Sequence, residues 1–173
     1  VTSNYDVTED YGTLKITQRT VTITSGNKEK VYDGYEMSLN DHHMSAGTLA
    51  LNHNLVFLNN GIVVKDVCEV LNSIEYKIVD IEGNDVTSNY DVTEDYGILK
   101  ITPRPITITV KDAEKIYDGT PLTSELFEIS VDSLVLDHHV EIEFTGSQTN
   151  AGESKNIYES IVILSGEEDV TRN

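Results

Sequence analysis

Short stretches of alternating apolar and polar residues recur along the chain. They are rich in Val, Ile and Thr, and alternation at period two with β-branched residues is typical of half-buried strands. The clearest stretches are residues 14–17, 20–24, 99–102, 106–110 and 140–144. Glycine-containing turns separate them, and no long stretch keeps the 3.6-residue period of a helix. The pattern therefore predicts a mostly β chain.

The chain also contains an internal repeat with a period of 85 residues. Residues 1–17 recur as residues 86–102 with one difference, Thr13 against Ile98. The motif Lys-x-Tyr-Asp-Gly likewise occurs twice, at residues 30–34 and 115–119. Self-similarity at a fixed period indicates a tandem arrangement of structural units.

The two prolines at positions 103 and 105 mark the expected boundary between units, because proline stiffens the chain and lacks a donor for a strand ladder. We predict that residues 1–17 are the closing strand of a preceding repeat unit (here called the N-terminal segment). Residues 18–102 are then a complete unit (the first repeat), and residues 103–173 a second unit lacking its final strand (the second repeat). A permuted order of strands is the alternative.

Each repeat is long enough to bury one modest core. Several short strands bounded by turns favour a tandem pair of small β-sandwich modules, immunoglobulin-like in the loose sense. A sheet with one short helix packed on it is the second possibility.

The repeats differ most over residues 61–71. There Val64, Val67, Cys68 and Leu71 have the spacing of one helical face, so one short helix is expected in the first repeat. An extra strand is the alternative, because valine disfavours helices. The same region is a candidate interaction patch. Its residues are Val56, Leu58, Ile62, Val63, Val64, Val67 and Leu71.

Charge narrows the classes of partner. Thirty acidic and twelve basic residues give a net charge of −18, so the chain repels nucleic acids and anionic lipid head groups. We expect no nucleic-acid partner. We also expect no membrane insertion, because no apolar run approaches the ~20 residues of a spanning helix. The chain begins with Val1 rather than Met, and we expect it to be an excised segment of a longer protein.

The candidate chemistry is sparse. The triplets Asp41-His42-His43 and Asp137-His138-His139 are not equivalent in the repeat, and we expect neither to be a metal site. The acidic groups at 80–85 and 91–95 lack the ligand spacing of an EF-hand. The single cysteine, Cys68, excludes an internal disulfide and is expected to be a small apolar filler. No catalytic motif is present, so we expect no enzyme and no cofactor.

The repeated Lys-x-Tyr-Asp-Gly motif has a structural interpretation. Asp-Gly is typical of tight turns. We expect Tyr32 and Tyr117 to anchor these turns by burying their rings in the core of each repeat.

Three segments resemble the YDG/MBG-type tandem repeat domains of bacterial cell-surface, adhesin-like proteins. They are residues 115–123 (KIYDGTPLT), residues 146–152 (GSQTNAG) and residues 85–102, which close the first repeat. The first repeat departs from the pattern at Tyr35-Glu36 and at residues 62–71. The resemblance implies extracellular modules of secreted or wall-anchored proteins, without enzymatic activity.

Two functional hypotheses follow. The first is a stalk or spacer in a bacterial surface protein, with neighbouring repeat units of the same protein as partners. The second is an adhesive module that contacts a host glycan or protein, of unknown identity, through the apolar 55–71 region. We also expect head-to-tail strand exchange between molecules, in which Leu14–Thr17 completes residues 103–173 of a neighbour.

Overall fold

The computed structural model describes residues 4–130, 134–135 and 137–171. These residues form fifteen β-strands and one 3₁₀ turn, η1 (Thr87–Asn89), and include no α-helix. No helix among them is long and apolar enough to cross a membrane. The prediction of a mostly β chain is confirmed.

Ten strands belong to the first repeat. They are β1 (Arg19–Thr24), β2 (Lys28–Val31), β3 (Met37–Ser38), β4 (His43–Gly47), β5 (Asn54–Phe57), β6 (Val63–Val64), β7 (Cys68–Leu71), β8 (Tyr76–Val79), β9 (Tyr90–Asp95) and β10 (Ile98–Thr102). They form two three-stranded sheets, β4-β1-β9 and β2-β10-β7, and two strand pairs, β3-β6 and β5-β8.

The last two strands of the first repeat close its core. β9 runs parallel to β1, and β10 runs parallel to β2 while pairing antiparallel with β7 on its other side. β10 thereby brings Leu99 and Ile101, both fully buried, against Tyr32 and Met37. Burying such apolar side chains is the main source of stability in a small domain.

The second repeat contains the remaining five strands. They are β11 (Ile108–Val110), β12 (Phe127–Ile129), β13 (His138–Phe144), β14 (Tyr158–Ser165) and β15 (Glu168–Asp169). Its strand pairs have the registers of the first repeat. Adding 85 to the β1–β4 pair Ile23↔Met44 gives the β11–β12 pair Ile108↔Ile129. Adding 85 to the β5–β8 pair Leu55↔Ile78 gives the β13–β14 pair Val140↔Ile163.

The second repeat has no described strand in the places of β9 and β10. Its core is correspondingly thin, because Val170 is its one hydrophobic side chain classed as buried among the described residues. β11 begins at Ile108, four residues later than the counterpart of Arg19. Pro105 removes one ladder donor there, and no described strand covers this edge.

The strand predicted at residues 14–17 does not form. Residues 5–18 are extended without a pairing partner, and Leu14 and Ile16 are fully exposed. A single strand has no partner for its backbone hydrogen bonds and no core to pack on, so the sequence that forms β10 in the first repeat remains irregular here.

The short helix expected in the first repeat was also wrong. Residues 63–64 and 68–71 form strands β6 and β7, which pair with β3 and β10. Helical spacing of four apolar residues was outweighed by the low helix propensity of valine and by the neighbouring strands available for pairing.

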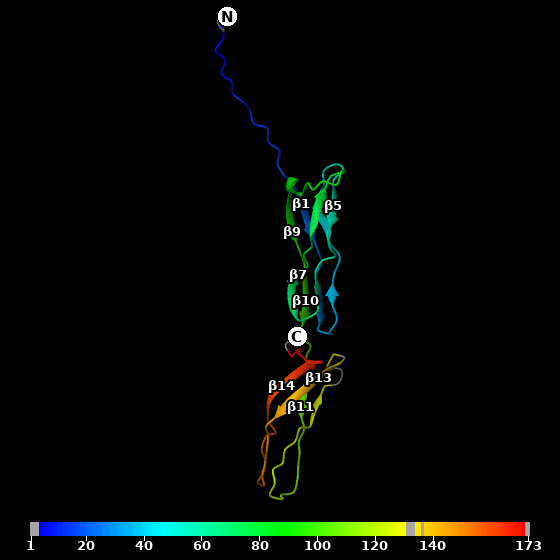
Figure 1. Ribbon diagram of the computed structural model, residues 1–173, viewed down its shortest axis with the longest axis vertical. Helices are drawn as coiled ribbons and strands as arrows, with labels where there is room; N and C mark the ends of the chain where they lie inside the picture. Colours follow the sequence, from blue (N-terminus) through cyan, green and yellow to red (C-terminus); the bar gives the residue numbers. More distant parts are fainter. Residues whose placement is uncertain (1–3, 131–133, 136, 172–173) are drawn as a thin grey trace.

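The molecule is elongated, with the two repeats end to end (Figure 1). Its accessible surface is 12857 Å², whereas a compact protein of 19.2 kDa exposes about 8,400 Å². At the junction, the rings of Tyr32 and His138 lie 6.0 Å apart between centroids, and Val135 packs against the core cluster of the first repeat. The N-terminal segment leaves from the end of the first repeat that faces away from the second.

Candidate interaction site

The Lys-x-Tyr-Asp-Gly motif forms a hydrogen-bonded turn in the first repeat. Lys30 Nζ donates to Asp33 Oδ1 and, at 2.7 Å, to the carbonyl oxygen of Tyr35. The backbone N–H of Tyr35 donates to Asp33 Oδ1 at 3.0 Å. Gly34 has a φ of +78°, a conformation that glycine adopts without strain.

The motif forms the same turn in the second repeat. Lys115 Nζ donates to Asp118 Oδ1 at 2.8 Å and to the carbonyl oxygen of Thr120 at 2.7 Å, and the N–H of Thr120 donates to Asp118 Oδ1 at 2.9 Å. In both repeats the lysine hydrogen bond is the main cause that holds the pKa of the aspartate below its usual range. The charged groups of the motif thus satisfy one another and fix the turn.

The tyrosines of the two motifs differ sharply in exposure. Tyr32 is 5% exposed and packs in the core cluster with Leu99 and Ile101, as expected. Tyr117 is 65% exposed, so the expectation that it is buried was wrong. Its ring lacks cover because no described residue of the second repeat takes the place of the two β10 side chains.

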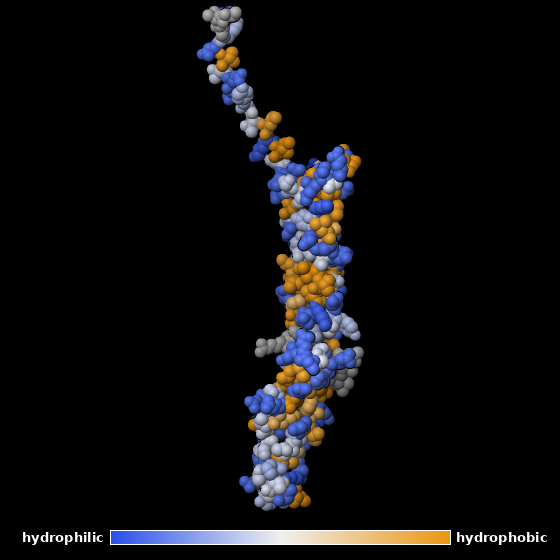
Figure 2. All heavy atoms as spheres, in the orientation of Figure 1, coloured by the Kyte–Doolittle hydropathy of each residue, from blue (hydrophilic) through white to orange (hydrophobic). Residues whose placement is uncertain are grey.

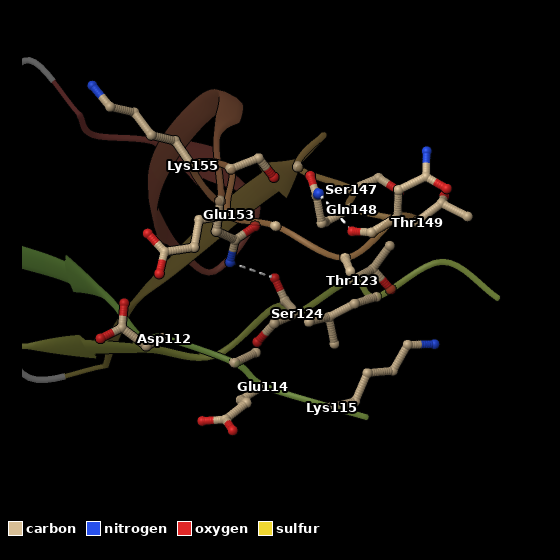
Figure 3. A pocket seen from close by; sticks show the side chains of 18 of the residues that line it. Asp112, Glu114, Lys115, Thr123, Ser124, Ser147, Gln148, Thr149, Glu153 and Lys155 are labelled. Atoms are coloured by element: carbon tan, nitrogen blue, oxygen red, sulfur yellow. Dashed lines mark hydrogen bonds between the residues drawn. The ribbon is translucent and has the colours of Figure 1, made fainter. Parts of the chain in front are cut away.

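The place of β10 in the second repeat is an open groove (Figure 3). We call this the acceptor groove. Its volume is about 700 Å³, and it is lined by residues 112–115, 117, 122–124 and 146–156. Residues 113–116 are the counterparts of β2 at a spacing of 85, and residues 153–156 are the counterparts of β7. These are the two strands between which β10 lies in the first repeat.

The floor of the acceptor groove mixes apolar and polar side chains. Tyr117 and Leu122 take the places of Tyr32 and Met37 in the first-repeat core. Figure 3 shows Ser124 between the two walls of the groove. The groove is therefore more polar than the core that β10 closes. Polar residues Ser124, Ser147 and Thr149 take the places of Leu39, Ile62 and Val64.

Hydrogen bonds hold the walls of the acceptor groove together without β10. Asn156 Nδ2 donates to the carbonyl oxygen of Ser124 at 2.9 Å. The N–H of Leu122 donates to the carbonyl oxygen of Gln148 at 2.8 Å, and the N–H of Gln148 donates back to Leu122 at 3.1 Å. The groove is thus formed before anything enters it.

The structure divides the predicted apolar patch. Ile62, Val64 and Val67 pack on the core cluster of the first repeat, and Val56 is half-buried in β5. The remaining members lie exposed on the surface. They are Leu58, Val63 and Leu71.

One exposed apolar pair lies on the sheet that contains β7. Leu71 pairs with Ile98 across β7 and β10, and both side chains are exposed. Figure 2 shows hydrophobic atoms gathered over the part of the first repeat where Figure 1 places β7. Sequence spacing did not identify this pair, because Ile98 comes from a strand distant in sequence.

The two Asp-His-His triplets have different surroundings. In the first, His42 is buried with Nε2 3.0 Å from the carbonyl oxygen of Asn72, and His43 Nδ1 lies 2.9 Å from the carbonyl oxygen of Asp41. In the second, the His138 ring contacts Tyr32 across the junction. Within the described part of the chain, no group of three or more His, Cys, Asp or Glu side chains is arranged to hold a metal ion.

Asn72 is an important residue that the sequence did not single out. Its side chain is fully buried, and Nδ2 donates to the carbonyl oxygens of Leu39 at 3.1 Å and Gly26 at 3.4 Å. Its own carbonyl oxygen accepts a hydrogen bond from Ser25 Oγ at 2.8 Å. A buried asparagine of this kind belongs to no motif, so a single sequence gives no signal for it.

Comparisons with family models, with curated proteins and with solved structures find no match to this chain.

Proposed function

We propose that this chain is a non-catalytic stalk or spacer segment of a bacterial surface protein. The observation that carries the proposal is the end-to-end arrangement of the two repeats (Figure 1). In such an arrangement each added repeat lengthens the molecule, as in other repeat proteins whose units contact only their neighbours.

The proposed units are tandem small β-sandwich modules, immunoglobulin-like in the loose sense and similar to YDG/MBG-type domains. Two kinds of observation support this. The sequence repeats at a period of 85 residues, and the β1–β4 and β5–β8 registers recur in the second repeat at the same spacing. The resemblance also supports an extracellular location.

The contact between the repeats suits a semi-rigid spacer. β10 ends at Thr102 and Pro103 follows at once, so the junction has no flexible linker. The Tyr32–His138 ring contact and the packing of Val135 restrict bending. The net charge of −18 keeps neighbouring rods apart in solution.

A binding role is the second candidate, favoured by the exposed apolar side chains of the first repeat. Leu58, Val63 and Leu71 remain from the 55–71 region, and Ile98 lies opposite Leu71. An exposed apolar patch is typical of a contact surface when its area is large. A host glycan or protein is the expected ligand class in this case.

Small-angle X-ray scattering on dilute monomer tests the spacer proposal. A compact chain of 173 residues has a radius of gyration of about 16 Å, and we expect a clearly larger value with the profile of a rod. The Leu71→Ser/Ile98→Ser variant should give the same profile.

A binding assay on host cells separates the two candidates. The spacer proposal predicts that the wild-type chain is retained no better than this double variant. A compact scattering profile would contradict the spacer. Retention that the double substitution abolishes would establish the binding module instead.

A further inference from the structure

We propose that the N-terminal segment of one molecule inserts into the acceptor groove of a second molecule and completes its second repeat. The inserted residues are 5–17, and they form two strands in the places that β9 and β10 occupy in the first repeat. The product is a head-to-tail chain of molecules.

The first argument is the identity of the occupant. Residues 4–17 match residues 89–102, which include β9 and β10, with the single difference Thr13 against Ile98. Leu99 is fully buried in the first repeat, whereas the corresponding Leu14 is fully exposed. One sequence thus has a packed position and an unpacked position in the same molecule.

The second argument is the shape of the acceptor groove. It lies between the counterparts of β2 and β7, the strands that flank β10 in the first repeat. Tyr117, the counterpart of the buried Tyr32, is exposed beside it. Edge strands with free backbone groups accept an added strand readily, and here the added strand also covers an exposed tyrosine.

The first-repeat registers determine how the segment inserts. β10 pairs in parallel with β2 so that Thr102 lies opposite Val31, and the corresponding pair is Thr17 opposite Ile116. The N–H of Tyr32 donates to the carbonyl oxygen of Thr102 at 2.9 Å. We therefore expect the N–H of Tyr117 to donate to Thr17 of the inserted segment.

Charge complements this register. Lys100 lies opposite Glu29 in the β10–β2 pair, so Lys15 of the inserted segment lies opposite Glu114 at the groove wall that Figure 3 shows. Opposite charges directly across two strands stabilise the pairing.

The positions of donor and acceptor make the contact intermolecular. The N-terminal segment leaves one end of the molecule, while the loops that line the acceptor groove lie toward the opposite end (Figure 1). A contact between different surfaces at opposite ends does not close on itself in a rod, so it propagates into open chains.

The new junction would copy the one inside the molecule. His53 is the counterpart of His138 at a spacing of 85, and Tyr117 is the counterpart of Tyr32. We therefore expect Tyr117 of one molecule to contact His53 of the next, as Tyr32 contacts His138 across the junction between the repeats.

Light scattering across a concentration series tests the proposal. The mass of the wild-type chain should rise with concentration beyond a dimer, and Leu14→Ser/Ile16→Ser should weaken association at least tenfold, because two apolar side chains no longer become buried. The matched control Thr13→Ser/Thr17→Ser alters the outward positions of the segment and should behave like wild type. All four side chains are exposed, so folding of the monomer is not in question.

Three outcomes would overturn the proposal. They are a wild-type chain that stays monomeric, a dimer that does not grow, and a Leu14→Ser/Ile16→Ser variant that associates like wild type. The last would assign association to another surface, such as the Leu71–Ile98 pair.

Disulfide trapping tests the register itself. Chains with Thr17→Cys and chains with Ile116→Cys, mixed and oxidised, should form a covalent heterodimer, because neighbouring strands bring such pairs within disulfide distance. Lys15→Cys is two residues out of register with Ile116→Cys and should cross-link much less. Wild type, which has only Cys68, gives the background. Equal cross-linking of both pairs, or none above background, would refute the parallel insertion.

Discussion

At the scale of single residues, the molecule depends on buried polar side chains that link irregular segments. Asn72 is the clearest case. Its amide joins the carbonyl oxygens of Leu39 and Gly26, which come from two other segments of the first repeat. Because a buried carbonyl without a donor is costly, this one side chain stabilises three parts of the chain at once.

We predict that Asn72→Ala lowers the free energy of unfolding of the first repeat by about 1–3 kcal/mol, since it removes two hydrogen bonds and leaves buried acceptors unpaired. Urea-induced unfolding measures the change. Asn60→Ala, at an exposed position, is the control and should stay within about 0.5 kcal/mol of wild type. Equal effects of the two substitutions would show that the Asn72 amide does not link these segments.

At the scale of elements, the partner strand determines whether a sequence becomes a strand. Alternation correctly predicted the strands at residues 20–24 and 140–144. It failed at residues 14–17, which have the strand pattern but no neighbour, and at residues 64–71, which have helical spacing but pair with β3 and β10. Periodicity reports what a segment is able to form, whereas pairing across long sequence distances decides what it does form.

The two copies of this strand allow a direct comparison. We predict that Leu99→Ala lowers the free energy of unfolding by about 2–5 kcal/mol, because it leaves a cavity in a packed core. Leu14→Ala should change it by less than about 0.5 kcal/mol in dilute monomer, because Leu14 is fully exposed. Urea-induced unfolding at the lowest workable concentration measures both. A comparable loss for Leu14→Ala would mean that the N-terminal segment is packed within the monomer.

At the scale of the whole molecule, the sequence predicted the repeat but not how its parts meet. The 85-residue period and the expected absence of a closing strand from the second repeat were readable from residue identities. The junction was not, because the Tyr32–His138 contact joins residues more than one period apart and no pattern links them. The acceptor groove was also hidden, since it depends on β10 lying between two other strands.

The net charge of −18 leads to the last prediction. Two molecules that approach end to end repel one another, and the repulsion extends about 30 Å at 0.01 M salt but only about 8 Å at 0.15 M. The exposed Lys15–Glu114 pair adds little, since such pairs contribute about 0–1 kcal/mol. Strand insertion driven by Leu14 and Ile16 should therefore strengthen as sodium chloride rises from 10 to about 150 mM, as measured by sedimentation velocity. The Leu14→Ser/Ile16→Ser variant should stay monomeric throughout. Association that weakens with added salt would show that ion pairs, rather than buried apolar side chains, hold the molecules together.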